Sequence, residues 1–276
     1  MQRIKVMING IPGNMAATVA KKALRDNRFE VILASLTGPD IEETAYTIDE
    51  KIFTLVRPDS RLDRIKKILA QSGPFISIDY THPSAVNDNA GFYCDHALPF
   101  VMGTTGGDRE PLEKRVGASA IPAVIAPNMA KQIVGFQAMM AYAAASFPDL
   151  FKGYTLQVKE SHQQGKADTS GTAKAIIGYF NSLGIPFTTA DIVKERLPEK
   201  QQKEWAIPEE YLTGHAWHTY SLDSGDGTVH FEFTHNVNGR EVYAAGTLDA
   251  VAYLSKKIDS GIKGTVFTMM DVLKNV

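Results

Sequence analysis

The feature that most constrains the fold of this chain is a glycine turn close to its start. Residues 4–16 read Ile-Lys-Val-Met-Ile-Asn-Gly-Ile-Pro-Gly-Asn-Met-Ala, which is a short apolar run, two nearby glycines and the beginning of a segment with helical period. A strand that passes through glycines into a helix presents backbone N–H groups on which a dinucleotide pyrophosphate can sit. The pattern therefore predicts the first strand–turn–helix unit of a nucleotide-binding domain.

The match to the dinucleotide fingerprint G-x-G-x-x-G is incomplete. Gly10 takes the first position, Pro12 stands in place of the second glycine, and Ala16 takes the last position, where alanine is tolerated. A purely structural turn is the alternative interpretation. We predict that the turn holds the pyrophosphate through six consecutive residues: Gly10, Ile11, Pro12, Gly13, Asn14 and Met15.

The rest of the first half alternates short apolar runs with segments of helical period. The strand-like runs are Ile4–Asn9, Glu30–Leu36, Ile52–Val56, Phe75–Asp79, Pro99–Met102 and Ala123–Ala126. Met15–Asp26 and Leu62–Ala70 have the apolar stripe of amphipathic helices. This alternation predicts an α/β fold with a doubly wound parallel sheet, which we assign to a dinucleotide-binding domain over residues 1–129.

The pattern changes after residue 129. We expect helices at Ala130–Ser146 and Gly171–Leu183, and strands at Tyr154–Glu160, His215–Ser221, Val229–Thr234 and Glu241–Ala245. The charged stretch Lys194–Glu210 is expected to run over the surface. Two further helices, Thr247–Ser260 and Gly264–Leu273, complete the chain. We predict an open mixed α+β domain over residues 130–246, for substrate binding and oligomerisation, with residues 247–276 packing back on the first domain.

The ends of three strands bear on the cofactor. The second strand ends with Ser35 and Thr37 and has no carboxylate for the ribose 2′-hydroxyl of NAD, so NADPH is favoured over NADH, although no arginine is adjacent in the sequence. Two later loops leave strands at the same predicted sheet edge and are candidates for the nicotinamide wall, with strand-terminating turns as the alternative. Their residues are Gly103, Thr104 and Thr105, and Ala126, Pro127, Asn128 and Met129.

A second motif leaves a strand, forms a polar loop and enters a helix. The loop carries His162 and Lys166, and the helix begins at Ser170-Gly171-Thr172. Unpaired amides and the positive end of a helix dipole make such a start suitable for a carboxylate. Lys166 can supply a positive charge and a proton. A solvated loop is the alternative, but these ingredients together favour an acidic substrate.

Composition excludes several classes of partner. Lys and Arg total 29 against 31 Asp and Glu, so the chain lacks the basic surplus that nucleic acid would require. A single cysteine, Cys94, fits a reducing compartment. The start of the chain has no signal-peptide pattern and no apolar run is long enough to span a membrane, so we expect no membrane partner and a cytoplasmic location, or an organelle stroma if a transit peptide was removed. The seven histidines show no metal-ligand spacing, so we predict no metal.

Six ordered motifs resemble the dihydrodipicolinate reductase family, also called 4-hydroxy-tetrahydrodipicolinate reductase. They are Asn9-Gly10-x-x-Gly13-x-Met15, Asp79-Tyr80-Thr81-x-Pro83, Gly103-Thr104-Thr105-Gly106, Ala126-Pro127-Asn128-Met129, His162-x-x-x-Lys166 with Asp168-x-Ser170-Gly171-Thr172-Ala173, and Thr234-His235 followed by Gly239-Arg240 and Ala245-Gly246. The resemblance runs from about Ile4 to Leu273. Residues 153–157, 214–220 and 231–233 look closer to the plant-type branch than to the common bacterial form.

The resemblance implies an oxidoreductase of lysine and diaminopimelate biosynthesis that reduces a cyclic dicarboxylate imine to tetrahydrodipicolinate with NADPH or NADH, as a homodimer or homotetramer. His162 and Lys166 match the family's catalytic pair, and the helix start at Ser170, Gly171 and Thr172 matches its grip on a substrate carboxylate. Gln163, which we include among the substrate-binding residues, stands where the bacterial form has a second histidine. Arg240 matches a family arginine to which we assign no role.

Two other functions stay open at this point. Another two-domain NAD(P)H reductase of amino-acid metabolism, such as a semialdehyde dehydrogenase, would need a cysteine nucleophile, and Cys94 has no supporting motif around it. A regulator that senses the dinucleotide without catalysis would not need the loop that carries His162 and Lys166.

Overall fold

The chain folds into two compact units and passes between them twice. The computed structural model describes residues 2–166 and 168–275. One unit is Gln132–Arg240, and the other combines the residues before and after it. The second crossing point falls at Arg240, so the last part of the chain belongs to the same unit as the beginning.

The first unit is built on a six-stranded sheet in which every neighbouring pair is parallel. In spatial order the strands are β13 (Val266–Phe267), β8 (Ala123–Ile125), β7 (Phe100–Met102), β6 (Ile76–Asp79), β1 (Ile4–Asn9) and β2 (Phe29–Val31). The central strands β6, β7 and β8 are buried along their whole length, as expected when helices cover both faces. The predicted doubly wound parallel sheet is confirmed.

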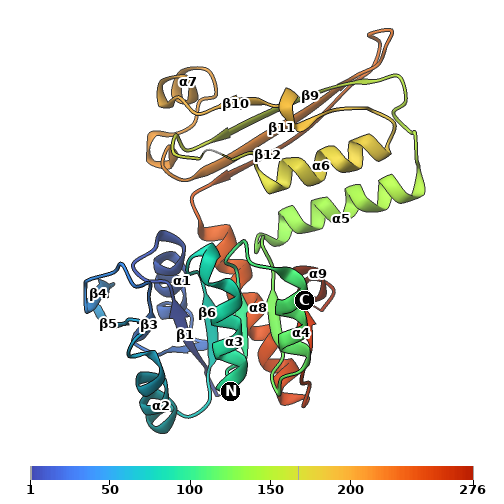
Figure 1. The fold of residues 1–276 in the computed structure, drawn as a ribbon. Helices are drawn as coiled ribbons and strands as arrows, with labels where there is room; N and C mark the ends of the chain where they lie inside the picture. The colour runs from blue at the N-terminus through green and yellow to red at the C-terminus, as the bar shows by residue number, and fades with distance from the viewer. Residues whose placement is uncertain (1, 167, 276) are drawn as a thin grey trace. The chain divides into compact units, whose positions relative to one another are not determined.

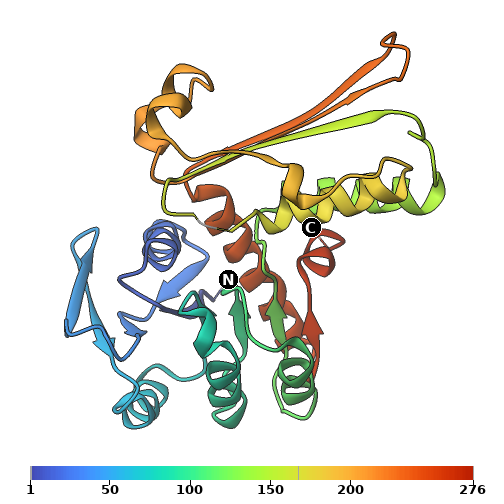
Figure 2. The same ribbon diagram turned by 45° about the horizontal axis from the view of Figure 1, so that its top comes forward.

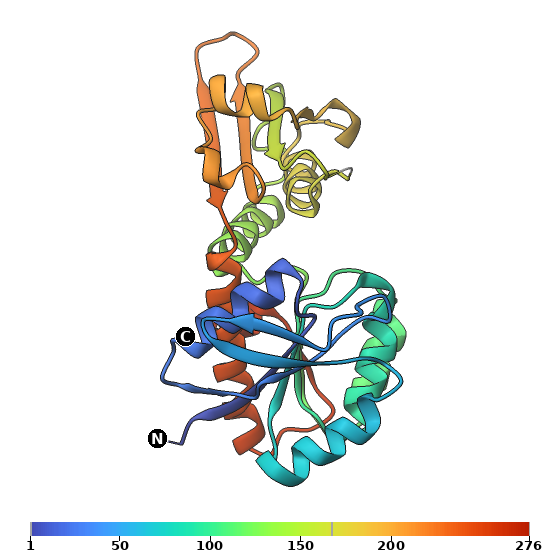
Figure 3. The same ribbon diagram turned by 90° about the vertical axis from the view of Figure 1, so that its left-hand side faces the viewer.

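Helices cover the two faces of this sheet (Figure 3). α1 (Asn14–Leu24) and the long α8 (Glu241–Asp259) pack together on one face. The other face holds α2 (Arg61–Ser72), α3 (Val86–Asp95) and α4 (Arg109–Gly117), whose buried residues Ile65, Ala90 and Val116 join Phe100 and Met102 in one apolar cluster. A short 3₁₀ turn, Pro83–Ala85, leads into α3, and α9 (Met269–Leu273) is the last helix among the described residues.

The predicted strand Glu30–Leu36 is divided in two. After β2 the chain bends, with the Ala34 amide bonding to the Ile32 carbonyl, and β3 (Ala34–Leu36) joins a separate small sheet. There β3 pairs in parallel with β5 (Lys51–Val56), which forms an antiparallel hairpin with β4 (Ala45–Ile48), seen at the blue end of the colour scale in Figure 2. Most of β4 is exposed, so no apolar run in the sequence indicated it.

Two predictions for the end of the chain are wrong. The predicted strand Glu241–Ala245 is the first part of α8, whose buried residues Ala244, Leu248 and Val251 recur at helical rather than alternating spacing. The predicted helix Gly264–Leu273 contains β13, which extends the parallel sheet beside β8, and only its last residues form α9. A two-residue edge strand is too short to show a period of its own.

The second unit is an open mixed sheet with helices on one face (Figure 1). The order is β10 (Val193–Glu195), β9 (Thr155–His162), β11 (His215–Asp223) and β12 (His230–Asn238); β10 runs parallel to β9 and the other pairs are antiparallel. α5 (Lys131–Ser146) and α6 (Gly171–Ser182) pack on it, with Phe180 and Met140 in a cluster that includes Val158 and Tyr220. The mixed α+β architecture is confirmed.

The stretch Lys194–Glu210 does more than run over the surface. It contains α7 (Pro198–Lys203) and overlaps β10 at its start and the 3₁₀ turn Glu209–Tyr211 at its end, and a further 3₁₀ turn at Thr189–Asp191 precedes it. Gln201 is fully buried, while Lys200 and Lys203 are exposed. Sequence analysis did not predict that Gln201 is buried, because composition alone does not show which side of a short charged helix faces the protein.

Candidate active site

The glycine turn of the first unit is shaped by two close backbone approaches. Gly10 has φ +104°, and a Cβ there would lie 2.1 Å from the Tyr80 carbonyl oxygen; a Cβ on Gly13 would lie 2.8 Å from the Gly10 carbonyl oxygen. Gly13 is the N-cap of α1, where no side chain caps the helix. The first-turn amides of α1 have no acceptor inside the helix, so this backbone cradle fits the phosphates of a dinucleotide.

Buried side chains brace the turn from behind. The Asn9 side chain accepts a hydrogen bond from the Leu36 amide (3.0 Å) and donates one to the Tyr93 hydroxyl (3.0 Å). The Ser35 hydroxyl accepts from the Ile11 amide (3.1 Å) and is fully buried. Ser35, predicted as a cofactor contact, therefore faces the turn itself. Thr37 is the first residue after β3.

Asp79 is the centre of a second group, which we call the Asp79 hub: Asp79, Thr81, Asn89, Tyr93 and Thr104. Asp79 is fully buried and accepts hydrogen bonds from the Thr104 hydroxyl (2.6 Å), the Tyr93 hydroxyl (2.7 Å), the Thr81 hydroxyl (2.8 Å) and the Asn89 amide group (3.1 Å). Burial raises the pKa of the Tyr93 phenol well above its ordinary value, so Tyr93 donates. The hub ties the end of β6 to the loop that begins at Gly103.

The remaining cofactor candidates follow β8 at the same edge of the sheet. The Ala126 amide bonds to the Met102 carbonyl (3.1 Å), which aligns the two loops. Asn128 accepts from the Ala130 amide (2.9 Å), and Gly246 of α8 lies so close to the Met129 carbonyl that a Cβ would stand 1.8 Å from it. The turn after β1 and the loops after β7 and β8 thus leave the parallel sheet at the carboxyl ends of its strands, where α/β sheets bind ligands. Ser35 and Thr37 belong instead to β3 of the small sheet and to the residue after it.

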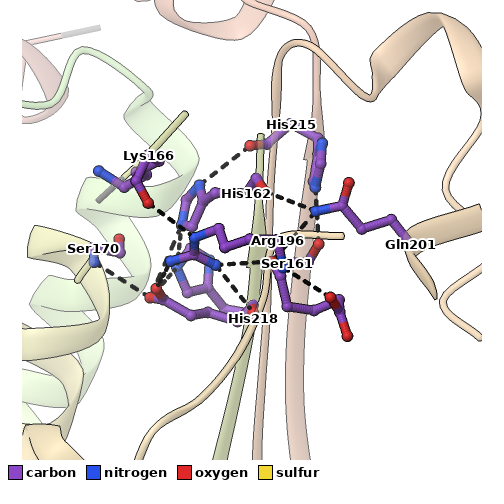
Figure 4. A network of polar contacts seen from close by, with 10 residues as sticks. Ser161, His162, Lys166, Ser170, Arg196, Gln201, His215 and His218 are labelled. Carbon is purple, nitrogen blue, oxygen red and sulfur yellow. Dashed lines mark hydrogen bonds and ion pairs between the residues drawn. The ribbon is translucent and has the colours of Figure 1, made fainter. Parts of the chain in front are cut away.

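In the second unit, the predicted catalytic residues adjoin a buried polar centre (Figure 4). We call it the Glu160 centre: Glu160, His162, Arg196 and His218. Glu160 has no exposed surface and pairs with the Arg196 guanidinium, which comes from the segment after β10. Its second oxygen accepts from the Ser170 amide (3.3 Å) and lies 3.9 Å and 3.8 Å from Nε2 of His162 and His218.

Both ring nitrogens of His162 face other protein groups. Nδ1 lies 3.2 Å from the His215 carbonyl oxygen, and because a carbonyl only accepts, Nδ1 carries the proton. Nε2 of neutral His162 is then an acceptor, 3.3 Å from Nε2 of His218, which donates to it. His162 is 6% exposed. In this arrangement, the lone pair of His162 is directed at His218.

Burial keeps three neighbouring imidazoles neutral. It lowers the pKa of His162 to about 3, with the Arg196 and Lys166 charges adding to the effect, and lowers the pKa of His235 to about 4. Burial also lowers the pKa of His218 well below its ordinary value. The His218 and His235 rings, from β11 and β12, have centroids 4.6 Å apart. The sheet therefore carries a row of uncharged histidines that sequence analysis did not identify as a group.

Arg196 and Gln201 were also missed. Gln201 donates to the His162 carbonyl (2.7 Å), and Arg196 Nε donates to the Lys166 carbonyl (3.1 Å). One signal was available: the alternation in β9 places Glu160 on the inward face with Val158, and a buried carboxylate requires a partner. The sequence does not show that this partner lies beyond residue 190.

The predicted substrate residues are at the end of the loop. The Lys166 amide closes a turn onto the Gln163 carbonyl (3.0 Å), and Gln163 is half-buried. Ser170 is the N-cap of α6 without a side-chain cap bond, and Gly171 is exposed, with open space where a Cβ would stand. Arg240 lies elsewhere in the unit, against the backbone of Gly214.

Glu160, His162 and His218 also form a possible metal-ligand set that residue spacing did not reveal. Their three facing atoms all lie within 4.8 Å of one another, and two imidazoles with a carboxylate are a zinc-like donor set. A divalent ion would add two positive charges beside Arg196, which already neutralises the only carboxylate of the set. Burying that excess charge is costly, and the absence of a metal stays a prediction.

Comparison with known proteins identifies the family on both halves of the chain. Residues 4–129 match the family model described as dihydrodipicolinate reductase, N-terminus, and residues 133–273 match the one described as dihydrodipicolinate reductase, C-terminus. A chloroplastic 4-hydroxy-tetrahydrodipicolinate reductase 2 of Arabidopsis thaliana is 45% identical over 273 residues, covering 98% of this chain and 77% of the relative. A probable chloroplastic reductase 1 of Oryza sativa is 44% identical, covering 98% and 78%.

Among solved structures, the dipicolinate-bound dihydrodipicolinate reductase of Paenisporosarcina sp. TG-14 aligns with a TM-score of 0.67 and 18% identity, covering 97% of this chain and 98% of that one. This similarity supports the two-unit fold. Within the part of the chain that the structure describes, no helix is both long and apolar enough to cross a membrane.

Proposed function

This chain belongs to the dihydrodipicolinate reductase family, and we propose that it reduces its cyclic dicarboxylate imine with Lys166 as the proton donor. Its relatives are 4-hydroxy-tetrahydrodipicolinate reductases, oxidoreductases of lysine and diaminopimelate biosynthesis. The observation that carries the proposal is the single short segment from His162 to Ser170, which joins a lysine to the start of a helix. Cation and anion-binding amides are thereby held a few residues apart.

The helix start binds the substrate. The first-turn amides at Gly171 and Thr172 receive one carboxylate at the positive end of α6, with the Ser170 hydroxyl beside them. Gln163, half-buried at the other end of the loop, offers an amide contact in place of a histidine. Fixing the dianion in this way holds its ring in a near-attack geometry.

Lys166 supplies the proton and His162 holds the loop. When bound, a nicotinamide dinucleotide would supply a hydride for a ring carbon of the imine. The Lys166 ammonium would give its proton to the neighbouring centre, which takes up the displaced electron pair. His162 is neutral, and its lone pair faces His218. We therefore assign His162 to positioning rather than to proton donation.

For the cofactor we propose NADPH, with the 2′-phosphate bound by Thr37 and Arg57. The Thr37 amide bonds to the Val56 carbonyl (3.0 Å), because β3 and β5 run in parallel with Leu36 beside Val56. Arg57 follows Val56 and is exposed. A hydroxyl and a guanidinium that follow two paired strands suit a phosphate monoester. Strand pairing thus supports the choice of Arg57, which adjacency in the sequence did not suggest.

The proton-donor proposal is tested with Lys166→Ala. We expect kcat to fall about 10²–10⁴-fold with the NADPH KM nearly unchanged, which is the usual range for a lost general acid. Turnover is followed as NADPH oxidation with the cyclised product of aspartate semialdehyde and pyruvate. Lys152→Ala, exposed in the turn before β9, is the control and should retain wild-type turnover. Wild-type kcat in Lys166→Ala would contradict the proposal.

The cofactor proposal is tested with Arg57→Ala. We expect the KM for NADPH to rise about tenfold, the effect of losing one charged hydrogen bond, while the KM for NADH stays within twofold. Arg64→Ala, exposed on α2, serves as the control. An equal change for both cofactors would remove Arg57 from the 2′-phosphate site.

We also propose a homodimer or homotetramer, supported by the sheet face of the second unit that lies opposite α5 and α6. There Thr155, Gln157 and Lys159 are exposed. Light scattering after size exclusion tests it, and a monomer at micromolar concentration would contradict it. The relatives are named as chloroplastic, which supports the stromal alternative for location.

A further inference from the structure

We propose that the Glu160–Arg196 pair is a clip that positions the proton donor and the substrate-binding helix start together. The inference rests on the proposed function, because it names what holds Lys166 and Ser170 in place. Arg196 and Glu160 are then positioning residues. Neither residue needs to contact the substrate for its substitution to lower kcat.

The Arg196 guanidinium bonds to the loop after β9, to β9 itself and to its own neighbour Glu195. Nε donates to the Lys166 carbonyl (3.1 Å), one terminal nitrogen donates to the Glu195 carbonyl (2.9 Å), and the other pairs with the Glu160 carboxylate. A guanidinium is planar and presents its donors at fixed angles, so these contacts fix the loop backbone relative to β9 and β10. Lysine, with one charged nitrogen, cannot reproduce them.

Glu160 extends the clip to the far end of the same loop. Its second oxygen accepts from the Ser170 amide (3.3 Å), immediately before α6. The loop is therefore held at its middle by Arg196 and at its end by Glu160, and Gln201 holds the His162 carbonyl where the loop begins (2.7 Å). Arg196 and Gln201 lie in the segment between β10 and the end of α7.

Burial strengthens the clip. Glu160 is fully buried and the Arg196 side chain is only 16% exposed, so water competes little for their contact. A guanidinium that pairs with a buried carboxylate holds it more firmly than an exposed pair would. The neighbouring neutral histidines add no competing charge.

The experiment is a double-mutant cycle between Arg196 and Lys166. We expect Arg196→Ala and Arg196→Lys to lower kcat by about 10–100-fold, because loss of positioning costs less than loss of the acid, with the NADPH KM within twofold. In the Lys166→Ala background, Arg196→Lys should change kcat by less than threefold. Millimolar guanidinium should partly restore kcat to Arg196→Ala and leave the Lys166→Ala enzyme unchanged. Lys200→Ala, exposed on α7, is the control.

Amide hydrogen exchange tests the clip without reference to catalysis. Exchange at Lys166 and Ser170 should rise in Arg196→Lys, while the amides of α5 stay protected. Wild-type kcat in Arg196→Ala, equal effects of Arg196→Lys in both backgrounds, or unchanged exchange at Ser170 would each overturn the clip. If Lys166→Ala keeps wild-type turnover while exchange at Lys166 and Ser170 still rises in Arg196→Lys, the proton-donor proposal fails and the clip stands.

Discussion

Each unit has a fully buried carboxylate beside its candidate site, and the two differ in the groups that satisfy them. Asp79, in the first unit, is surrounded by hydroxyl and amide donors, all from residues within 25 positions of it in the chain. Glu160, in the second, is paired with the Arg196 guanidinium and faces two imidazoles. Neutral donors satisfy the first carboxylate from its own neighbourhood in the chain. The second depends on a guanidinium from a distant segment.

Glu160→Gln should have the largest effect on stability. The amide keeps the size of the side chain but leaves the Arg196 charge without a counterion, which costs about 3 kcal/mol in the free energy of unfolding. Urea unfolding followed by tryptophan fluorescence measures it, because Trp205 and Trp217 both belong to the second unit. Glu199→Gln, in an exposed ion pair with Lys203, is the control and should change stability by less than 1 kcal/mol.

Asp79→Asn should cost less, about 1–3 kcal/mol, because an asparagine still accepts through one oxygen and no charge is left unpaired. The Tyr93 hydroxyl loses its acceptor at the second oxygen. Hydrogen exchange at the β6 and β7 amides reports this loss in the first unit, with exposed Asp88→Asn as the control. If Asp79→Asn destabilised its unit more than Glu160→Gln does, the distinction between the two carboxylates would not hold.

Acid should unfold the second unit before the first. His162, with a pKa of about 3, and His235, with a pKa of about 4, bind protons in the unfolded chain below about pH 6.5 but not in the folded one. The unfolded state then holds more protons, so stability falls as the pH drops from 6.5 towards 4, by about 1.4 kcal/mol per pH unit for each histidine. Tryptophan fluorescence against pH measures this slope.

His235→Asn should make the slope shallower by the contribution of one histidine. His230→Asn, at an exposed position on β12, should leave the slope unchanged. Equal acid sensitivity of β6 and β9 amides in hydrogen exchange would show that the second unit has no special dependence on its neutral histidines.

The same contrast explains how much of the protein could be predicted. The glycine turn and the strand ends of the first unit act through the backbone, so contiguous motifs such as Gly10–Met15 predicted both the fold and the cofactor edge. The helix start at Ser170 was predictable for the same reason. The arginine proposed for the cofactor phosphate, Arg57, depends on the pairing of β3 with β5, and β4 and β5 form a hairpin of which only Ile52–Val56 was indicated by the sequence.

The Glu160 centre could not be assembled from the sequence because its members come from distant segments. Arg196 is 36 residues from Glu160, and His218 comes from another strand. Local propensity also failed where tertiary packing prevailed, as in residues 241–245, which resemble a strand but bury one side as the first turn of α8. Side chains that become neighbours through the register of strand pairing can be identified only when that register is known.

Cys94→Ser should have the smallest effect and separates this enzyme from a reductase that uses a thiol nucleophile. Cys94 lies in α3, partly buried against the apolar cluster of the first unit, and burial raises the pKa of its thiol, which disfavours the reactive thiolate. We expect less than about 1 kcal/mol of lost stability and unchanged kcat for NADPH oxidation. A fall in kcat of about 10³-fold or more would instead assign the chemistry to the first unit. That result would contradict the proposal that the first unit binds the cofactor through its backbone while the second unit supplies the proton.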